Sequence, residues 1–266
     1  MLSTTVREAV IAAVNVAVTR TLEDVSAGLV EDEPTFSARL ATRIQDGLRA
    51  LVLDGVTISA HIRNLADRGT GAAEAVYGAD LLVVLRVDTD DDTVNKGALI
   101  QAKGNTGREG VRVTGEQRHR LQVTTLTERF RTQCDRMLAF TPASFVWVYH
   151  DMGVRSATAA SVTEGSPGRS RTTVASTDIA DFVDGLLACT IGDRRLNAAD
   201  NRTLDQLLVD AGARTGLVVE IMGPDGATEF VDPPAPREEA RRPDAADEDL
   251  IAARLKPDPE PPPKGP

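Results

Sequence analysis

The most regular hydrophobic pattern in the chain is helical and lies at its N-terminus. Within residues 3–29, apolar residues recur at steps of three or four, which places them in one stripe along a helix: Val6, Val10, Val14, Val18, Leu22, Val25 and Leu29. A second pattern of the same spacing runs from Phe36 to Leu51, just after Glu31-Asp32-Glu33-Pro34. Proline suits the first turn of a helix, and acidic residues suit its positive end. The first 50 residues therefore predict two helices.

Two apolar runs separated by an acidic stretch predict a buried β-hairpin. The first run, residues 81–87, follows Asp80, and the second ends at Gln101-Ala102-Lys103. If the hairpin is symmetric about a loop at residues 88–95, Asp80 lies opposite Lys103 and Leu82 lies opposite Gln101. Residues two apart in a strand share a face, so Gln101 and Lys103 point the same way. A carboxylate, an amide and an ammonium group are thus expected to converge at the open end of the hairpin.

The remaining patterns alternate between strand and helix. Strands are predicted at residues 56–62, 144–149, 154–162 and 217–222, and helices at residues 116–140, 179–187 and within 193–211. Residues 104–115 are predicted to form a flexible, glycine-containing connection. This order predicts an α/β fold with a mixed central sheet flanked by helices.

We divide the chain into four parts. Residues 1–30 form an N-terminal helix, residues 31–160 the α/β core, and residues 161–232 a C-terminal α/β extension packed on that core. Proline and charge dominate residues 233–266, which cannot bury enough apolar surface to offset their chain entropy. That tail is predicted to be disordered, and a protein-binding motif in it remains open.

Composition narrows the class of protein. The 266 residues are 41% hydrophobic, enough for one substantial core, and the net charge of −10 argues against indiscriminate binding to nucleic acid. The two cysteines, Cys134 and Cys189, lie far apart without metal-ligand spacing, which favours a reducing compartment. No apolar run approaches the roughly 18 residues of a membrane helix. A cytoplasmic protein that does not associate with membranes is expected.

The hairpin residues resemble the signature of the PD-(D/E)XK nuclease superfamily. In that family a helix carrying a glutamate precedes an aspartate at the head of one strand and a (Glu/Gln)-x-Lys sequence at the end of the next. Glu33, Asp80 and Gln101-Ala102-Lys103 follow that order, and the Gln-x-Lys form is similar to that of Mrr-like type IV restriction endonucleases. The resemblance covers about residues 30 to 150. It implies a restriction-endonuclease-like fold and a metal-dependent DNA endonuclease that acts in bacterial restriction or antiviral defence.

The chemistry of these residues suits phosphodiester hydrolysis, which needs charge stabilisation at the phosphate and a deprotonated water. Asp80 and Gln101 offer oxygen ligands of the kind that Mg²⁺ or Mn²⁺ prefers, and the resemblance adds the backbone carbonyl of Ala102 as a third. Lys103 can orient or help deprotonate the attacking water. Glu33 can bind the metal through water or hold a second metal ion.

Two other acidic residues remain open as partners of this site. Glu31 is an alternative to Glu33 as the helix carboxylate, and Glu74 is a further possible metal ligand. The competing interpretation is structural: Asp80 caps its strand, and Gln101 and Lys103 form the solvated end of an edge strand.

A locally basic segment suggests where nucleic acid would bind. Residues 103–136 contain more Arg and Lys than Asp and Glu, and the candidate phosphate contacts are Arg108, Arg112, Arg118 and Arg120. The alternative is an amphipathic helix with a solvated basic face. DNA is the expected partner, with RNA not excluded, and the resemblance implies a homodimer. The alternative function is a catalytically silent nuclease-fold protein that binds nucleic acid or a protein partner.

Overall fold

The computed structural model describes residues 2–30, 32–49, 51–65, 78–104, 111–113, 120–123, 127–150, 152–164, 172–224 and 226. The predicted tail, residues 233–266, lies outside the described residues. Among the described helices, none is long and apolar enough to cross a membrane.

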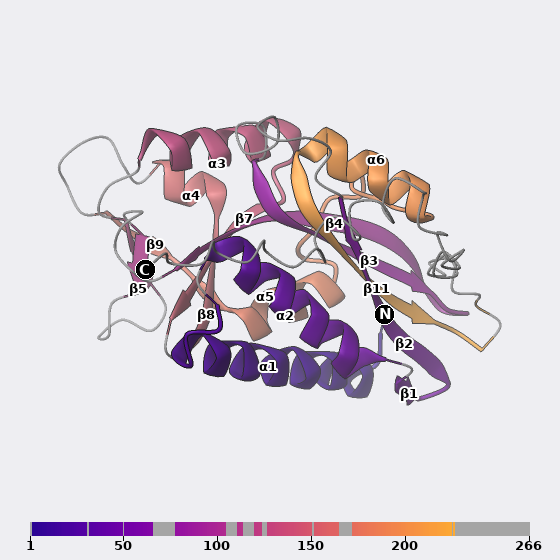
Figure 1. Cartoon of the computed structure of the whole chain (residues 1–266). Helices are drawn as coiled ribbons and strands as arrows, with labels where there is room; N and C mark the ends of the chain where they lie inside the picture. Colours follow the sequence, from indigo (N-terminus) through magenta and orange to yellow (C-terminus); the bar gives the residue numbers. More distant parts are fainter. Residues whose placement is uncertain are drawn as a thin grey trace, which may run out of the picture. The chain divides into compact units, whose positions relative to one another are not determined.

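An eight-stranded mixed sheet forms the centre of the structure (Figure 1). Its spatial order is β1-β2-β11-β3-β4-β7-β8-β10. The strands are β1 (Leu51–Leu53), β2 (Val56–Asn64), β3 (Ala79–Asp88), β4 (Thr93–Gly104), β7 (Ser144–His150), β8 (Gly153–Thr158), β10 (Thr177–Asp178) and β11 (Ala213–Met222). The pairs β11–β3 and β4–β7 are parallel, and the other neighbours are antiparallel. The predicted α/β class with a mixed central sheet is confirmed.

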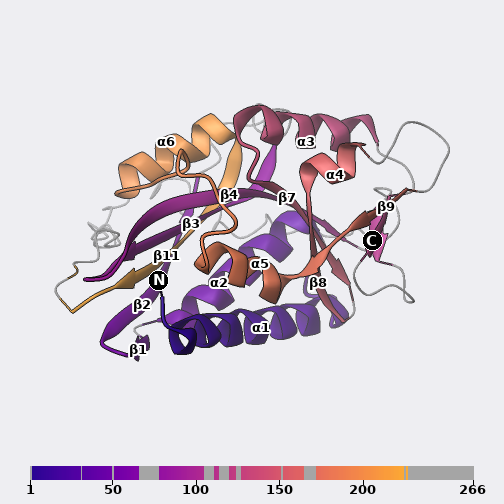
Figure 2. The ribbon, with the colours of Figure 1, turned by 180° about the vertical axis from the view of Figure 1, so that it is seen from behind.

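Helices cover both faces of this sheet (Figures 1 and 2). One face carries α1 (Thr4–Ser26), α2 (Glu33–Leu48) and α5 (Ile179–Leu187), and the other carries α3 (Glu128–Phe140), α4 (Ala159–Glu164) and α6 (Asn201–Ala211). Two apolar cores result because successive strand residues point to opposite faces. Leu81 of β3 packs in the core with α1, α2 and α5, and its neighbour Leu82 packs in the core with α3, α4 and α6.

The β3–β4 hairpin has a different register from the predicted one. Leu81 pairs with Ile100 and Asp88 pairs with Thr93, so the connection is a turn at residues 89–92 rather than a loop at 88–95. Backbone hydrogen bonds close this turn, because Thr89 N–H donates to Asp92 O at 3.0 Å. The predicted pairing of Asp80 with Lys103 is therefore wrong by two residues. A shift of two keeps every side chain on its face, so the predicted convergence of the three polar groups survives.

Strand β11 occupies the middle of the sheet, between β2 and β3. Sequence patterns predicted only a short strand, residues 217–222, inside an appended extension. The observed strand has ten residues and is buried along nearly its whole length, so the sheet is incomplete without it. Residues 1–230 cluster as one compact unit, in which β11 belongs to the same sheet as the strands of the predicted core. Helix α6 feeds directly into β11 through Gly212, whose φ of +60° suits glycine.

Two predicted elements change type along their length. The predicted helix at 116–140 begins only at Glu128, where Thr127 is the N-cap and accepts a hydrogen bond from Phe130 N–H at 3.2 Å. Before it, β5 (Val111–Val113) and β6 (Arg120–Val123) join β9 (Thr172–Ala175) in a second, three-stranded sheet. The buried residues of β6, Leu121 and Val123, alternate with the less buried Arg120 and Gln122, which is the period of a strand. Likewise, the predicted strand at 154–162 ends at Thr158, and residues 159–164 are α4.

Candidate active site

Polar side chains converge where β3 begins, β4 ends and α2 begins. Asp80 is the second residue of β3, Gln101 and Lys103 lie near the end of β4, and Glu33 is the first residue of α2. Asp80, Gln101 and Lys103 are only 9%, 1% and 4% exposed, although their immediate neighbours on the strands are apolar. Burying such groups destabilises a fold unless they are paired, so their contacts identify what holds them there.

One oxygen of the Asp80 carboxylate is saturated and the other is not. Asp80 Oδ2 accepts hydrogen bonds from Ala102 N–H at 2.9 Å and from the Gln101 side-chain amide. Asp80 Oδ1 has no hydrogen-bond partner among the described residues. The buried Gln101 Oε1 also lacks a partner among the described residues. Two unpartnered oxygens therefore lie on adjacent strands at the same end of the sheet.

Burial raises the pKa of Asp80 from 3.8 to about 6. The nearby Lys103 ammonium and the Ala102 N–H both lower this pKa, whereas the Glu33 carboxylate raises it. The net upward shift means that desolvation outweighs the hydrogen bonds and the cation already present. A further cation beside Asp80 would relieve this unfavourable burial of charge.

Lys103 links β4 to α2 through Glu33. Its Nζ donates to Glu33 Oε2 at 3.0 Å and lies 5.3 Å from the centroid of the Phe130 ring, on α3. Gly104 N–H donates to the other Glu33 oxygen at 3.4 Å. The Lys103 side chain is 5% exposed and that of Glu33 is 27% exposed. The ammonium is thus held between a carboxylate and an aromatic face, where its conformational freedom is small.

Sequence patterns did not identify Tyr149, which closes one side of the site. Its ring stacks on Phe36 with centroids 4.0 Å apart, and burial followed by the Glu33 carboxylate raises its pKa to about 12. The parallel β4–β7 register places it beside Gly104, where a Cβ atom would lie 2.9 Å from the tyrosine hydroxyl oxygen. Because this pairing joins strands far apart in sequence, no local signal predicted the contact.

The donor atoms fit a hard divalent cation. Mg²⁺ takes oxygen ligands, commonly one or two carboxylates with several waters. Asp80 Oδ1 and Gln101 Oε1 are such donors and lack other partners among the described residues. The Ala102 carbonyl lies 3.3 Å from the Gln101 amide nitrogen and so belongs to the same cluster. Within the described ranges no group of three or more His, Cys, Asp or Glu residues is arranged to hold a metal, so the amide and carbonyl oxygens would be essential.

The structure describes only some of the other predicted site residues. Glu31, Glu74, Arg108 and Arg118 lie outside the described residues. Arg112 lies on β5, and Arg120 is exposed on β6, so the candidate phosphate contacts belong to a small sheet rather than to a loop and helix. Of the proposed upstream acids, Glu33 contacts Lys103.

Comparison with known proteins adds no independent identification: no family model, no curated protein and no solved structure matches this chain. The resemblance to PD-(D/E)XK nucleases therefore depends on the site residues and on the order of the elements that carry them.

Proposed function

We propose that the protein is a metal-dependent nuclease that hydrolyses phosphodiester bonds in DNA. The observation that carries this proposal is the pair of unpartnered oxygens, Asp80 Oδ1 and Gln101 Oε1, beside an ammonium that is held in place by Glu33. A buried carboxylate with a raised pKa next to a lysine is the pattern expected of a functional site, because a purely structural core would avoid it.

Each residue has a separate task in this proposal. Asp80, Gln101 and the Ala102 carbonyl would hold a Mg²⁺ or Mn²⁺ ion, which would supply charge stabilisation at the phosphate and a lowered pKa of bound water. Lys103 orients the attacking water and neutralises charge that develops on the phosphate. Glu33 positions the Lys103 ammonium through their 3.0 Å contact and does not need to touch the substrate.

Exposed cations on β6 and α3 are the candidate contacts for the phosphate backbone. They are Arg120 on β6 and Arg129 in the first turn of α3. Phe130, the next residue after Arg129, contacts Lys103, so the start of α3 lies close to the site. Such contacts bind DNA without reading its sequence, and their affinity falls with added salt. Cutting both strands would require two sites, so we include a homodimer in the proposal.

The test is a cleavage assay on plasmid, linear duplex and single-stranded DNA, with RNA as a further substrate, in Mg²⁺ or Mn²⁺. Wild type should cut DNA, and chelation of the metal should stop the reaction. Asp80→Asn and Lys103→Met should each lower the rate by at least about a hundredfold, the usual scale for one catalytic group. Asp88→Asn is the matched control, because Asp88 is exposed at the far end of the same strand, and its rate should equal that of wild type.

Two results would overturn the proposal. One is intact nucleic acid under all of these conditions, which would leave the catalytically silent binding protein as the better account. The other is equal cleavage by wild type and Lys103→Met, which would assign the activity to a contaminant or to another site.

A further inference from the structure

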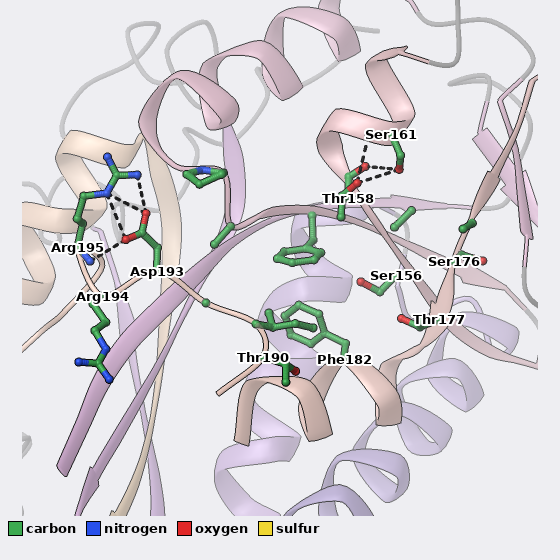
Figure 3. Close-up of a pocket in the computed structure, with 17 residues that line it drawn as sticks. Ser156, Thr158, Ser161, Ser176, Thr177, Phe182, Thr190, Asp193, Arg194 and Arg195 are labelled. Carbon is green, nitrogen blue, oxygen red and sulfur yellow. Dashed lines mark hydrogen bonds and ion pairs between the residues drawn. The ribbon is translucent and has the colours of Figure 1, made fainter. Parts of the chain in front are cut away.

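A hollow lies away from the candidate active site (Figure 3). It has a volume of about 850 Å³, within the range of small-molecule sites. Its walls come from the start of β7, the end of β8, α4, the last residue of β9, β10, α5 and the segment after α5. None of the candidate catalytic residues lines it. Phe145, which lines the hollow, packs in the core with α1, α2 and α5. Val146, the β7 residue that pairs with Gln101, packs in the core on the opposite face of the sheet.

The apolar part of the wall includes two aromatic rings beside the aliphatic residues Pro142, Ala143, Ala157, Ala175 and Ile191. Phe145 and Phe182 form an edge-to-face pair with centroids 5.0 Å apart and an interplanar angle of 78°. Phe182 is 1% exposed, so it is fixed by its packing, and Phe145 is 9% exposed. Phe182 therefore fixes the Phe145 ring in place, and the part of Phe145 that stays exposed can contact a planar ligand at little cost in side-chain entropy.

Two hydroxyl groups face these rings. Ser156 on β8 and Thr177 on β10 are direct cross-strand partners, so their side chains share a face, and Figure 3 shows both pointing toward the rings. Neither hydroxyl has a hydrogen-bond partner among the described residues, although Ser156 is only 3% exposed. Thr177 is exposed and the Ser156 hydroxyl is not sealed from the hollow, so both groups can bond to a ligand that enters it.

Other hydroxyls on the wall are already used within the protein. Thr158 Oγ1 donates to Ser161 Oγ at 2.9 Å, and Thr190 Oγ1 donates to Gly185 O at 3.1 Å. Ser176 Oγ accepts from Arg155 Nε at 3.3 Å. Among the described residues of the wall, the hydroxyls of Ser156 and Thr177 are therefore the ones still available to a ligand.

The charged end of the hollow has a net positive charge. The Asp193 carboxylate accepts hydrogen bonds from Thr141 Oγ1 at 2.7 Å and from the Arg195 guanidinium. The hydrogen bond from Arg195 is the main cause that lowers the pKa of Asp193 to about 2. Asp193 and Arg195 therefore neutralise each other. The Arg194 side chain is exposed and has no hydrogen bond or ion pair with a described residue. In Figure 3 it extends away from the rings, so it must turn toward the hollow to meet the anionic group of a ligand.

We propose that this hollow is a binding site for a mononucleotide-like molecule. Its planar ring would pack on Phe145, its polar groups would bond to Ser156 and Thr177, and its anionic group would meet Arg194. The site is independent of the proposed nuclease function, because it shares no residue with the candidate active site.

The test uses isothermal titration calorimetry on the full chain without added metal. The probes are AMP, GMP, CMP and UMP, with adenosine and inorganic phosphate as the two halves of one ligand. At least one nucleotide should bind, and more tightly than either half. Ser156→Ala and Thr177→Val should each weaken binding about fivefold, the effect of one lost hydrogen bond, and Arg194→Gln should weaken it about tenfold.

Two control variants distinguish binding in this hollow from binding elsewhere on the protein. Thr173→Val, an exposed substitution on β9 outside the hollow, should bind like wild type. Lys103→Met should also bind like wild type, whereas loss of binding there would assign the nucleotide to the candidate active site and overturn the proposal. The proposal also fails if no nucleotide binds, if phosphate or adenosine alone binds as tightly as AMP, or if the three pocket variants bind like wild type. Unfolding curves for each variant confirm that its fold is intact.

Discussion

Replacing Asp80 by asparagine should stabilise the metal-free protein at neutral pH. Burial raises the pKa of Asp80 from 3.8 to about 6, so ionising this group in the folded protein is unfavourable. One pKa unit corresponds to about 1.4 kcal/mol, so a shift of about two units corresponds to about 3 kcal/mol of lost stability once the group is ionised. An asparagine is neutral at every pH and is close to aspartate in size, so Asp80→Asn avoids this loss.

The pH window follows from the direction of the shift. Between the unfolded pKa near 4 and the folded pKa near 6, the folded protein binds more protons at Asp80 than the unfolded chain does. Stability from this group is therefore present below about pH 4 and is lost as the pH rises to about 6. The advantage of Asp80→Asn over wild type should appear across that window and stay constant above it.

The assay is thermal and urea unfolding of wild type and Asp80→Asn in the presence of a chelator, from pH 4 to pH 8. At pH 8 the melting temperature of Asp80→Asn should be higher by roughly 6 to 12 °C, given 2–4 °C per kcal/mol for a unit of this size. Asp88→Asn is the control, and a surface change of this kind should alter stability by less than about 0.5 kcal/mol. Equal or lower stability of Asp80→Asn at pH 8 would refute the reasoning.

Three further results follow from single contacts. Gly104→Ala should cost about 1–3 kcal/mol, because its Cβ would lie 2.9 Å from the Tyr149 hydroxyl oxygen; urea unfolding measures this, and Tyr149→Phe should recover part of the loss. In the native protein a thiol reagent should modify Cys189, which is exposed, and spare Cys134, which is buried with a pKa raised to about 12. Mass spectrometry should find one label before denaturation and two after it, and rapid native labelling of Cys134 would contradict the packing of α3. Added Mg²⁺ should raise the melting temperature of wild type more than that of Asp80→Asn, and an equal rise in both would place the ion elsewhere.

Local periodicity predicted the elements whose period is unambiguous. Helix α5 begins and ends where its apolar spacing predicted, at residues 179 and 187, and the hairpin follows from two apolar runs around an acidic turn. The convergence of Asp80, Gln101 and Lys103 was predictable because strand residues two apart share a face, which holds even when the register is wrong by two.

Features that depend on distant pairing were not predictable in the same way. The length of the β3–β4 turn is set by the hydrogen bonds of Thr89 with Asp92, and polar residues on either side fit both loop and strand. β11 lies in the middle of the sheet because it pairs in parallel with β3, and the paired residues are more than 100 positions apart in the sequence. The contact of Tyr149 with Gly104 has the same origin. Local sequence carries no information about which of several apolar strands will be neighbours.

In the segment before α3, the spacing of apolar residues can be interpreted with the period of a helix or with that of a strand. The predicted helix was extended back to residue 116 because Leu121 and Leu126 precede the apolar positions of α3. Residues five apart do not share a helical face, so this extension had little support from the helical period. In the structure Leu121 and Val123 are buried two residues apart, which is the period of a strand. Pairing of β6 with β9 decides between the periods, and β9 lies some 50 residues further along the chain.

The most direct test of the proposed function is a crystal of the protein grown or soaked with Mn²⁺, recorded at a wavelength where manganese scatters anomalously. The proposal predicts an anomalous peak with Asp80 Oδ1, the Gln101 amide oxygen and the Ala102 carbonyl as ligands, at distances near the roughly 2.1 Å typical of Mg²⁺ sites. The same peak should be absent from crystals of Asp80→Asn. A fully occupied peak elsewhere, or none beside Asp80 at pH 8, would contradict the assignment of these residues as a metal centre.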